Sequence, residues 1–135
     1  MMKTYSYFSC LIIVAFGSLL GTSAADEVER VYELESLKYV YTVSLTISGD
    51  QVLGSLQCQE YEDGRGEQIS FTGTVKGSQL TIKLKSDPEY LAVADPDDEG
   101  FHKWKATRKK LLIPIHSADD DGNPMVVDMP LRLKK

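Results

Sequence analysis

Apolar and polar side chains alternate with a period of two along most of the chain from residue 37 onward. This period is typical of a β-strand with one face in water and the other against an apolar core. The runs are separated by short segments rich in Gly, Asp and Pro, which favour tight turns. The first two runs carry the apolar positions Tyr39, Tyr41, Val43, Leu45 and Ile47, then Val52, Leu56 and Cys58.

A hairpin is the clearest local prediction. Ile69, Phe71 and Val75 alternate with polar residues, Gly77-Ser78 supplies a two-residue turn, and the alternation resumes over residues 80–84. Ala118–Pro124 is a strong turn, and a final alternating run over residues 127–133 predicts the last strand.

Three other segments allow two interpretations each. Residues 26–36 fit a short amphipathic helix or an entry strand. Residues 86–100 are irregular and acidic, and within them residues 90–93 could form a short edge strand. Residues 104–106 and 111–115 predict one long bent strand or two short ones.

Six to eight antiparallel strands joined by short turns must cover their apolar faces, as a closed barrel or as a sandwich of two sheets. Sequential hairpins favour an up-and-down meander. We therefore predict a mainly β fold, a single antiparallel meander closed as a β-barrel, with a β-sandwich as the alternative.

The N-terminus has the layout of a secretory signal peptide. Lys3 precedes an apolar run over residues 7–16, and Thr22-Ser23-Ala24-Ala25 offers small residues for cleavage after Ala24 or Ala25. We expect a signal peptide over residues 1–25, a single β-barrel domain over residues 26–135, and a periplasmic or secreted location. An exported domain without a disulfide and without an N-glycosylation sequon fits a bacterial periplasmic protein better than a secreted animal module.

Charge limits the classes of partner. The chain carries 15 Lys and Arg against 20 Asp and Glu, and removal of Lys3 with the signal makes the remainder more acidic still. Such a body is a poor partner for nucleic acid or for an anionic membrane surface. Cys58 would be the only cysteine after cleavage, and its alternation with Val52 and Leu56 predicts that it is buried.

Several strand and turn motifs resemble those of small exported bacterial proteins of the lipocalin-like (calycin) type. The matching pieces are Leu45–Asp50, Val52-Leu53-Gly54, Phe71–Gly77, Leu80-Thr81-Ile82 and Trp104. The Gly-x-Trp strand that opens true lipocalins has no counterpart here. The resemblance implies a lipocalin-like barrel in which an interior ligand pocket is possible.

Tyr39, Tyr41, Phe71 and Trp104 are the candidate ligand-binding residues, because strand alternation directs all four inward. Aromatic side chains of this kind line apolar ligand cavities. They also fill the interior of an eight-stranded barrel, and core filling is the simpler interpretation.

No catalytic, metal or cofactor site is predicted. The run Asp119–Asp128 has calcium-loop spacing in part, but Ser117 and Asp128 stand where that loop has its first and last ligands, and an ordinary turn explains it better. His102 and His116 lack partners at zinc-site spacing. Glu60 and Glu62 form a carboxylate pair, and a solvent-exposed strand end explains their presence better than acid–base catalysis does.

Residues 102–110 are the one basic run. It could form a patch for an acidic partner or a polyanion stacked on Trp104. Alternation offers a simpler explanation, in which Lys103 and Lys105 face solvent and Trp104 and Ala106 face the core.

Three functions remain open. The first is a non-enzymatic exported binding protein that holds a small apolar ligand in its mouth or a protein partner at its rim. The second is an exported inhibitor or immunity-type protein, in which the loop over residues 86–100 enters the cleft of a partner enzyme. The third and least favoured is a hydrolase that uses carboxylates.

Overall fold

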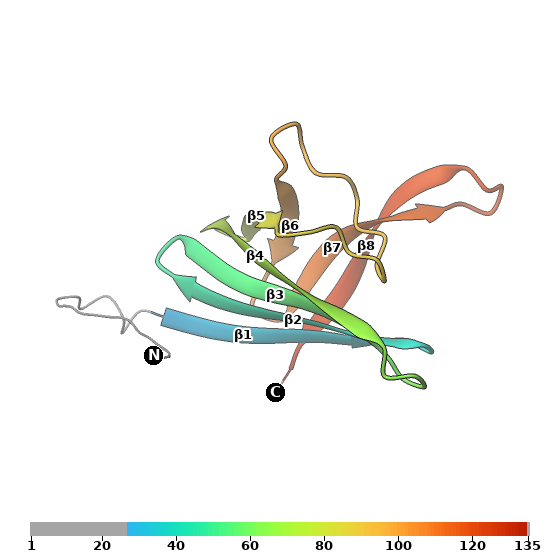
Figure 1. Cartoon of the computed structure of the whole chain (residues 1–135). Coiled ribbons are helices and arrows are strands. Elements are labelled where there is room, and N and C mark those ends of the chain that lie inside the picture. The colour runs from blue at the N-terminus through green and yellow to red at the C-terminus, as the bar shows by residue number, and fades with distance from the viewer. Residues whose placement is uncertain (1–26, 135) are drawn as a thin grey trace.

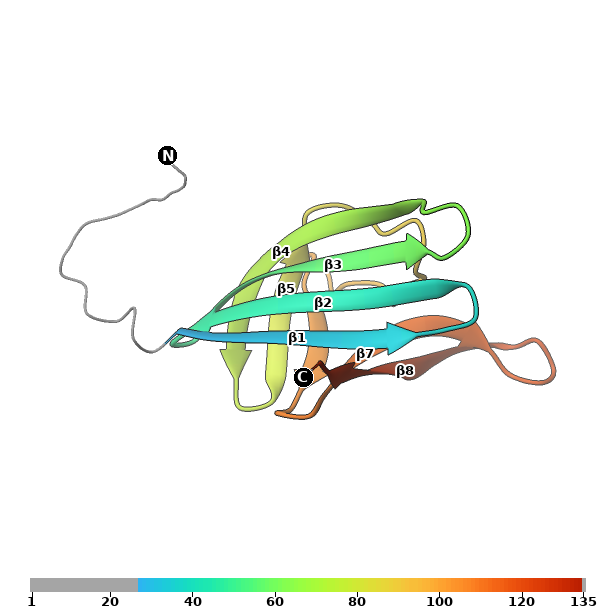
Figure 2. The ribbon, with the colours of Figure 1, turned by 90° about the horizontal axis from the view of Figure 1, so that it is seen from below.

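The computed structural model describes residues 27–134 and contains eight antiparallel strands. Each strand pairs with the next one in the sequence and β8 returns to β1, so that the sheet closes as a barrel (Figures 1 and 2). The strands are β1 (Glu27–Glu35), β2 (Tyr39–Ser48), β3 (Gln51–Glu60), β4 (Gly66–Lys76), β5 (Gln79–Leu84), β6 (His102–Ala106), β7 (Lys110–Ala118) and β8 (Pro124–Leu133). The predicted mainly β meander, closed as a barrel, is confirmed.

The structure decides between the open interpretations. The first segment is strand β1, and the two runs near the C-terminus are separate strands, β6 and β7. The edge strand considered at residues 90–93 is reduced to one isolated bridge, between Val93 and Ile115. The predicted signal peptide lies outside the described residues. No helix within residues 27–134 is long and apolar enough to cross a membrane.

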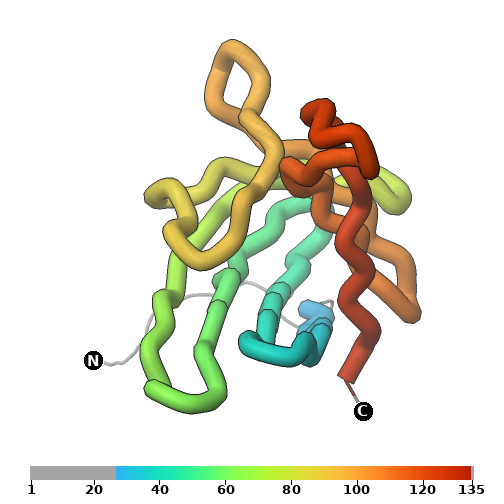
Figure 3. The backbone as a smooth tube through the Cα atoms, turned by 90° about the vertical axis from the view of Figure 1, so that its right-hand side faces the viewer, coloured from blue at the N-terminus to red at the C-terminus, as the bar shows by residue number. Residues whose placement is uncertain are grey.

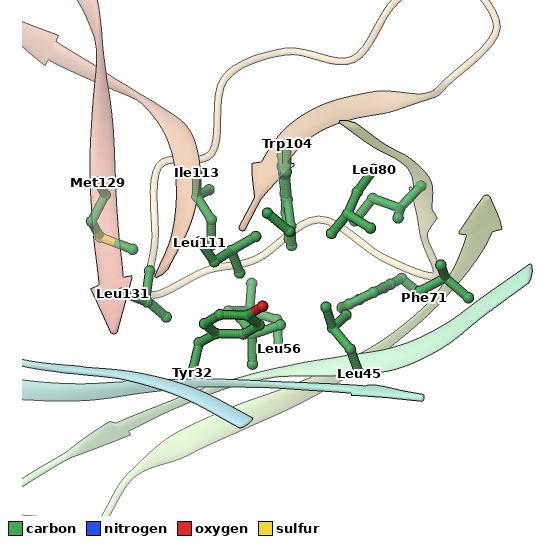
Figure 4. Close-up of a cluster of buried hydrophobic side chains, with 14 of the residues drawn as sticks. Tyr32, Leu45, Leu56, Phe71, Leu80, Trp104, Leu111, Ile113, Met129 and Leu131 are labelled. Atoms are coloured by element: carbon green, nitrogen blue, oxygen red, sulfur yellow. The ribbon is translucent and has the colours of Figure 1, made fainter. Parts of the chain in front are cut away.

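One apolar cluster fills the middle of the barrel, and all eight strands contribute to it (Figure 4). Apart from Leu91 of the β5–β6 loop, its members lie at inward positions of the strands, which explains why a period of two produces this core. The cluster comprises Tyr32, Val43, Leu45, Val52, Leu56, Cys58, Phe71, Leu80, Ile82, Leu91, Trp104, Ala106, Leu111, Ile113, Met129 and Leu131. The predicted burial of Cys58 is confirmed.

Strands β7 and β8 pair over nine positions, but two short ladders join them to the rest of the barrel. The β6–β7 and β1–β8 ladders have two pairs each. Continuing the two registers would oppose Pro114 to Lys103 and Pro130 to Glu35. Proline has no N–H to donate, so both ladders end where a proline removes the next hydrogen bond.

The two ends of the barrel differ in their connections. One end has the tight turns Gly49-Asp50 and Gly77-Ser78 and the short connection 107–109, whereas the other has the loops 36–38, 61–65, 85–101 and 119–123. At this second end the β7–β8 hairpin extends beyond the barrel, whereas the tip of the β5–β6 loop projects from the side of the barrel, next to β6 and β7 (Figures 1 and 3). We call this second end the loop end.

The packing of Phe71 over Gly54 yields a test of the core. A Cβ atom at residue 54 would lie 2.6 Å from Cζ of Phe71 and 2.5 Å from the carbonyl oxygen of Ser44. We expect Gly54→Ala to lower the free energy of unfolding by about 1–3 kcal/mol through overpacking. Urea denaturation measures this, with Gln57→Ala at an exposed position of the same strand as control. Equal midpoints for the two variants would contradict the packing described.

Candidate functional site at the loop end

The four aromatic residues predicted to bind a ligand lie in two separate pairs. Phe71 and Trp104 meet edge to face, with ring centroids 5.5 Å apart, and both are buried within the core cluster. Tyr39 and Tyr41 lie higher on β2, at the loop end, with centroids 5.9 Å apart. All four belong to the inward side, but the structure does not bring them together around one cavity. Their role in ligand binding stays a prediction.

The Tyr39–Tyr41 pair is joined by a residue that the sequence did not single out. Tyr90, from the β5–β6 loop, lies with its ring centroid 6.0 Å from that of Tyr39, edge to face. The neighbouring Leu91 is buried in the core cluster. This part of the long loop therefore folds back over the mouth of the barrel.

A carboxylate on β4 holds the loop in this position. Glu67 accepts the backbone N–H of Glu89 at 2.8 and 3.0 Å and that of Tyr90 at 2.8 Å. Hydrogen bonds to an ionised acceptor are about twice as strong as neutral ones. Beyond Tyr90 the loop runs beside β7, where Ala94 donates to the carbonyl of Pro114 and His116 donates to that of Ala92.

Cys58 and Tyr41 are paired across β2 and β3 beneath this cover. Burial, reinforced by the charge of Glu67, raises the pKa of the Cys58 thiol to about 12. Burial also raises the pKa of Tyr41. A thiol kept protonated in this way is a poor nucleophile, so Cys58 serves as a small apolar residue of the core.

The loop end is strongly acidic. Eleven carboxylates lie in its four loops against three cations. The carboxylates are Glu62, Asp63, Asp87, Glu89, Asp95, Asp97, Asp98, Glu99, Asp119, Asp120 and Asp121, and the cations are Lys38, Arg65 and Lys85. The connections at the opposite end hold Asp50, Arg108 and Lys109. The acidic excess therefore lies in these four loops, and Asp95, Asp97, Asp98 and Glu99 belong to the tip that projects from the side of the barrel.

Two aspartates fix the shapes of the projecting loops. Asp97 Oδ1 accepts the N–H groups of Glu99 and Phe101, each at 2.9 Å. Asp119 Oδ1 accepts those of Asp121 at 2.9 Å and Asn123 at 2.8 Å. These backbone donors lower the pKa of both carboxyls, with Phe101 the main cause at Asp97 and Asn123 at Asp119. Each turn is therefore ordered by its own sequence.

Apolar side chains are exposed among the acidic ones. Leu37 is fully exposed at the tip of the β1–β2 loop, and Tyr61 in the β3–β4 loop is half exposed. Met125 and Val126 are exposed on the projecting β7–β8 hairpin. Val28, Leu53 and Leu133 are exposed as well, away from the loop end, so four of the seven large exposed apolar side chains among residues 27–134 belong to this end.

The arrangement of the acidic loops offers little to a metal ion. No group of three or more His, Cys, Asp or Glu side chains among residues 27–134 is placed to hold one. One Asp119 oxygen is engaged by the backbone, and Asp128 lies within β8, paired with Pro114. Glu62 is exposed in a turn next to Glu60 at the end of β3.

The basic run 102–110 follows the simpler of its two interpretations. Trp104 and Ala106 are buried, and Lys103 and Lys105 are exposed. His102 is also buried. Its position two residues before Trp104 puts it on the same face of the strand, and this spacing could have predicted its burial. Burial is the main cause that lowers the pKa of His102, which favours the neutral imidazole. His116 is exposed and lies 3.3 Å from Asp95 Oδ1.

Comparisons with family models, with curated proteins and with solved structures find no match to this chain.

The tether at Glu67 can be removed without touching the core. We expect Glu67→Gln to raise the hydrogen-exchange rates of the Glu89 and Tyr90 amides about 10- to 100-fold, since hydrogen bonds to charged groups contribute about 1.5–3 kcal/mol. Exchange measured by NMR checks this, with Glu62→Gln on the exposed β3–β4 loop as the matched control. Unchanged exchange at both amides would contradict the tether.

Cys58 gives a pH dependence of stability. Its thiol ionises near 9.0 when exposed and only at about 12 when folded, so the unfolded state loses its proton first. The free energy of unfolding should therefore fall as the pH rises above 9. Urea midpoints between pH 8 and 11 should fall less steeply in Cys58→Ala than in the unmodified chain. Parallel pH curves would argue against a raised thiol pKa.

Proposed function

We propose that this chain is an exported, lipocalin-like β-barrel protein that binds a protein partner through its loop end and catalyses no reaction. One observation carries the proposal: an acidic excess and four exposed apolar side chains occur on the β7–β8 hairpin and on the loops that leave the same end of the barrel, and Asp97 and Asp119 order two of these loops. Such a surface combines the two features that protein recognition uses, apolar contact and charge complementarity.

The order of the loops favours binding. Ordering a flexible loop on association costs about 0.5–1.5 kcal/mol for each immobilised side chain. Asp97 and Asp119 fix the backbone of the two projecting turns beforehand. A partner then meets a preformed surface, and the acidic side chains select one with a basic face.

The filled interior supports a partner at the rim in preference to an apolar ligand inside. Phe71 and Trp104 are 2% and 1% exposed and belong to the packed cluster. The loop tethered by Glu67 covers Tyr39 from above. Inhibition of an enzyme is one form of the proposed activity, because the tip at residues 95–100 projects and could enter a cleft (Figure 1).

Export is supported by the sequence of the first 25 residues. A cation, an apolar run and small residues at a cleavage point follow one another in the order of a secretory signal. Within residues 27–134 the one cysteine, Cys58, is free and buried in the core cluster.

Photo-crosslinking in the native host tests the proposal. A photoreactive residue is placed at Asp98 in one projecting loop, at Asp120 in the other, and at Ser78 in a turn of the opposite end as control. We expect the same partner protein to be captured from both loop positions and at least tenfold less of it from Ser78. Capture should weaken as salt rises, because screening acts on exposed charges.

Two results would contradict the proposal. One is equal capture from Ser78, and the other is no common partner for Asp98 and Asp120. The intact mass of the same protein tests export separately, because a cleaved chain begins at Ala25 or Asp26, whereas an uncleaved chain keeps Met1 or Met2.

A further inference from the structure

The outer edge of β8 is unpaired at the loop end. The β1–β8 ladder stops at Glu33↔Arg132, and β1 itself ends at Glu35. Figure 2 shows that the β7–β8 hairpin continues beyond the end of β1. From Pro124 to Pro130, β8 therefore has β7 on one side and no strand of residues 27–134 on the other.

Hydrogen bonds beside the hairpin show which backbone groups of β8 point outward. Pro114 lies opposite Asp128, and its carbonyl accepts the N–H of Ala94 from the β5–β6 loop at 2.9 Å. This pair therefore makes no hydrogen bonds across the hairpin, and the N–H and C=O groups of Asp128 point away from β7. Because the direction alternates along a strand, those of Val126 point the same way. No backbone group from outside the hairpin bonds to either residue within residues 27–134.

The two faces of this edge differ in chemistry. Met125, Val127 and Met129 alternate on the inward face, and Met129 is buried in the core. Val126 and Asp128 are exposed on the outward face. Asp128 belongs to neither of the ion pairs formed within the described part of the chain. A strand laid along β8 would therefore meet apolar side chains on one face and a free carboxylate on the other.

We infer that an extended segment of the partner protein pairs with this edge of β8, with apolar side chains on its inward face and basic side chains on its outward face. The inference rests on the proposed function, because it names how the partner binds the loop end. Val126 and Asp128 can each exchange two backbone hydrogen bonds with an antiparallel segment. Pro124 and Pro130 have no N–H, which confines the new ladder to the residues between them.

Charge selects this occupant over a second copy of the chain. Residues 119–121, in the turn that ends the hairpin, are all aspartates, and Asp128 lies on the edge itself. A basic side chain opposite Asp128 forms a cross-strand pair of opposite charge. A second copy would instead bring another acidic turn, and like charges that face each other suppress such pairing.

Two seven-residue peptides test the pairing with the ¹⁵N-labelled protein. Lysine and valine alternate in the first, glutamate replaces lysine in the second, and both are acetylated and amidated at their ends. We expect the lysine peptide to bind with saturation and to slow amide exchange of Val126 and Asp128 at least tenfold. One of its Hα protons should contact Hα of Val127, as in a non-bonded antiparallel pair. The glutamate peptide should bind at least tenfold more weakly.

Two variants of one residue provide the second arm. Val126→Pro removes an outward N–H and no hydrogen bond to β7, whereas Val126→Thr keeps that N–H and serves as the matched control. We expect the proline variant to lose at least tenfold in affinity for the lysine peptide and the threonine variant to retain it. In the native host, the proline variant should also lose most of the partner captured from Asp120.

The inference is overturned if the lysine peptide leaves exchange of the Val126 and Asp128 amides unchanged, a result that the unmodified chain alone can give. Equal affinity in the two folded variants would overturn it as well. Protection of the same amides that rises with protein concentration, without peptide, would show a second copy on the edge and overturn the proposed occupant. Undiminished capture from Asp120 in Val126→Pro would overturn this inference alone, whereas equal capture from Ser78 would contradict the proposed function itself.

Discussion

The apolar interior is the constraint that closes this barrel. Hydrogen bonds alone give weak closure, because the hairpin of β7 and β8 is joined to its neighbours by two pairs on each side. The core cluster instead spans every strand, and Leu111, Ile113, Met129 and Leu131 anchor the hairpin in it. Burial of such a side chain contributes about 1.5–3 kcal/mol to the free energy of unfolding. The four buried side chains therefore hold the hairpin more strongly than the few hydrogen bonds of the two short ladders do.

Pro114 and Pro130 show how local chemistry shapes the wall. Each stands where a bonded pair would otherwise extend a ladder, and each ends it. On the side of β6, the β5–β6 loop takes over the hydrogen bonds of β7 through Ala92 and Ala94. The long loop is therefore part of the wall on one flank and a projecting turn at its tip. The packed core closes the sheet without help from the loops of the loop end, so these loops can differ in length and in charge.

Much of the fold could be predicted from the sequence, because strand alternation and turn chemistry are local signals. The alternation through Tyr39–Ile47 and the turn at Gly77-Ser78 identified strands and a hairpin that the structure contains. The segment 26–36 stayed ambiguous because its apolar residues satisfy both periods, and pairing with β2 makes it a strand. That pairing is a tertiary property.

Less of the candidate site could be predicted from the sequence. Strand alternation placed Tyr41 and Trp104 on the same face of the sheet, but it carries no information on their position along the barrel axis. It could therefore not separate the Tyr39–Tyr41 pair at the loop end from the Phe71–Trp104 pair in the core. Glu67 looks like any polar residue at the start of a strand, and its contact with Glu89 and Tyr90 spans more than twenty residues of sequence. The concentration of carboxylates at one end required the topology, because it depends on which loops share an end.

Native-state hydrogen exchange tests the central claim that the core closes the barrel. The amides of Leu112 and Glu33 lie in the two short ladders beside the hairpin. If the shared interior holds the hairpin in place, both amides exchange only when the whole barrel unfolds, with the same opening free energy as the amide of Leu56 in the middle of β3. Exchange of Leu112 and Glu33 through an opening several kcal/mol less costly would show that the hairpin separates by itself and would contradict this account.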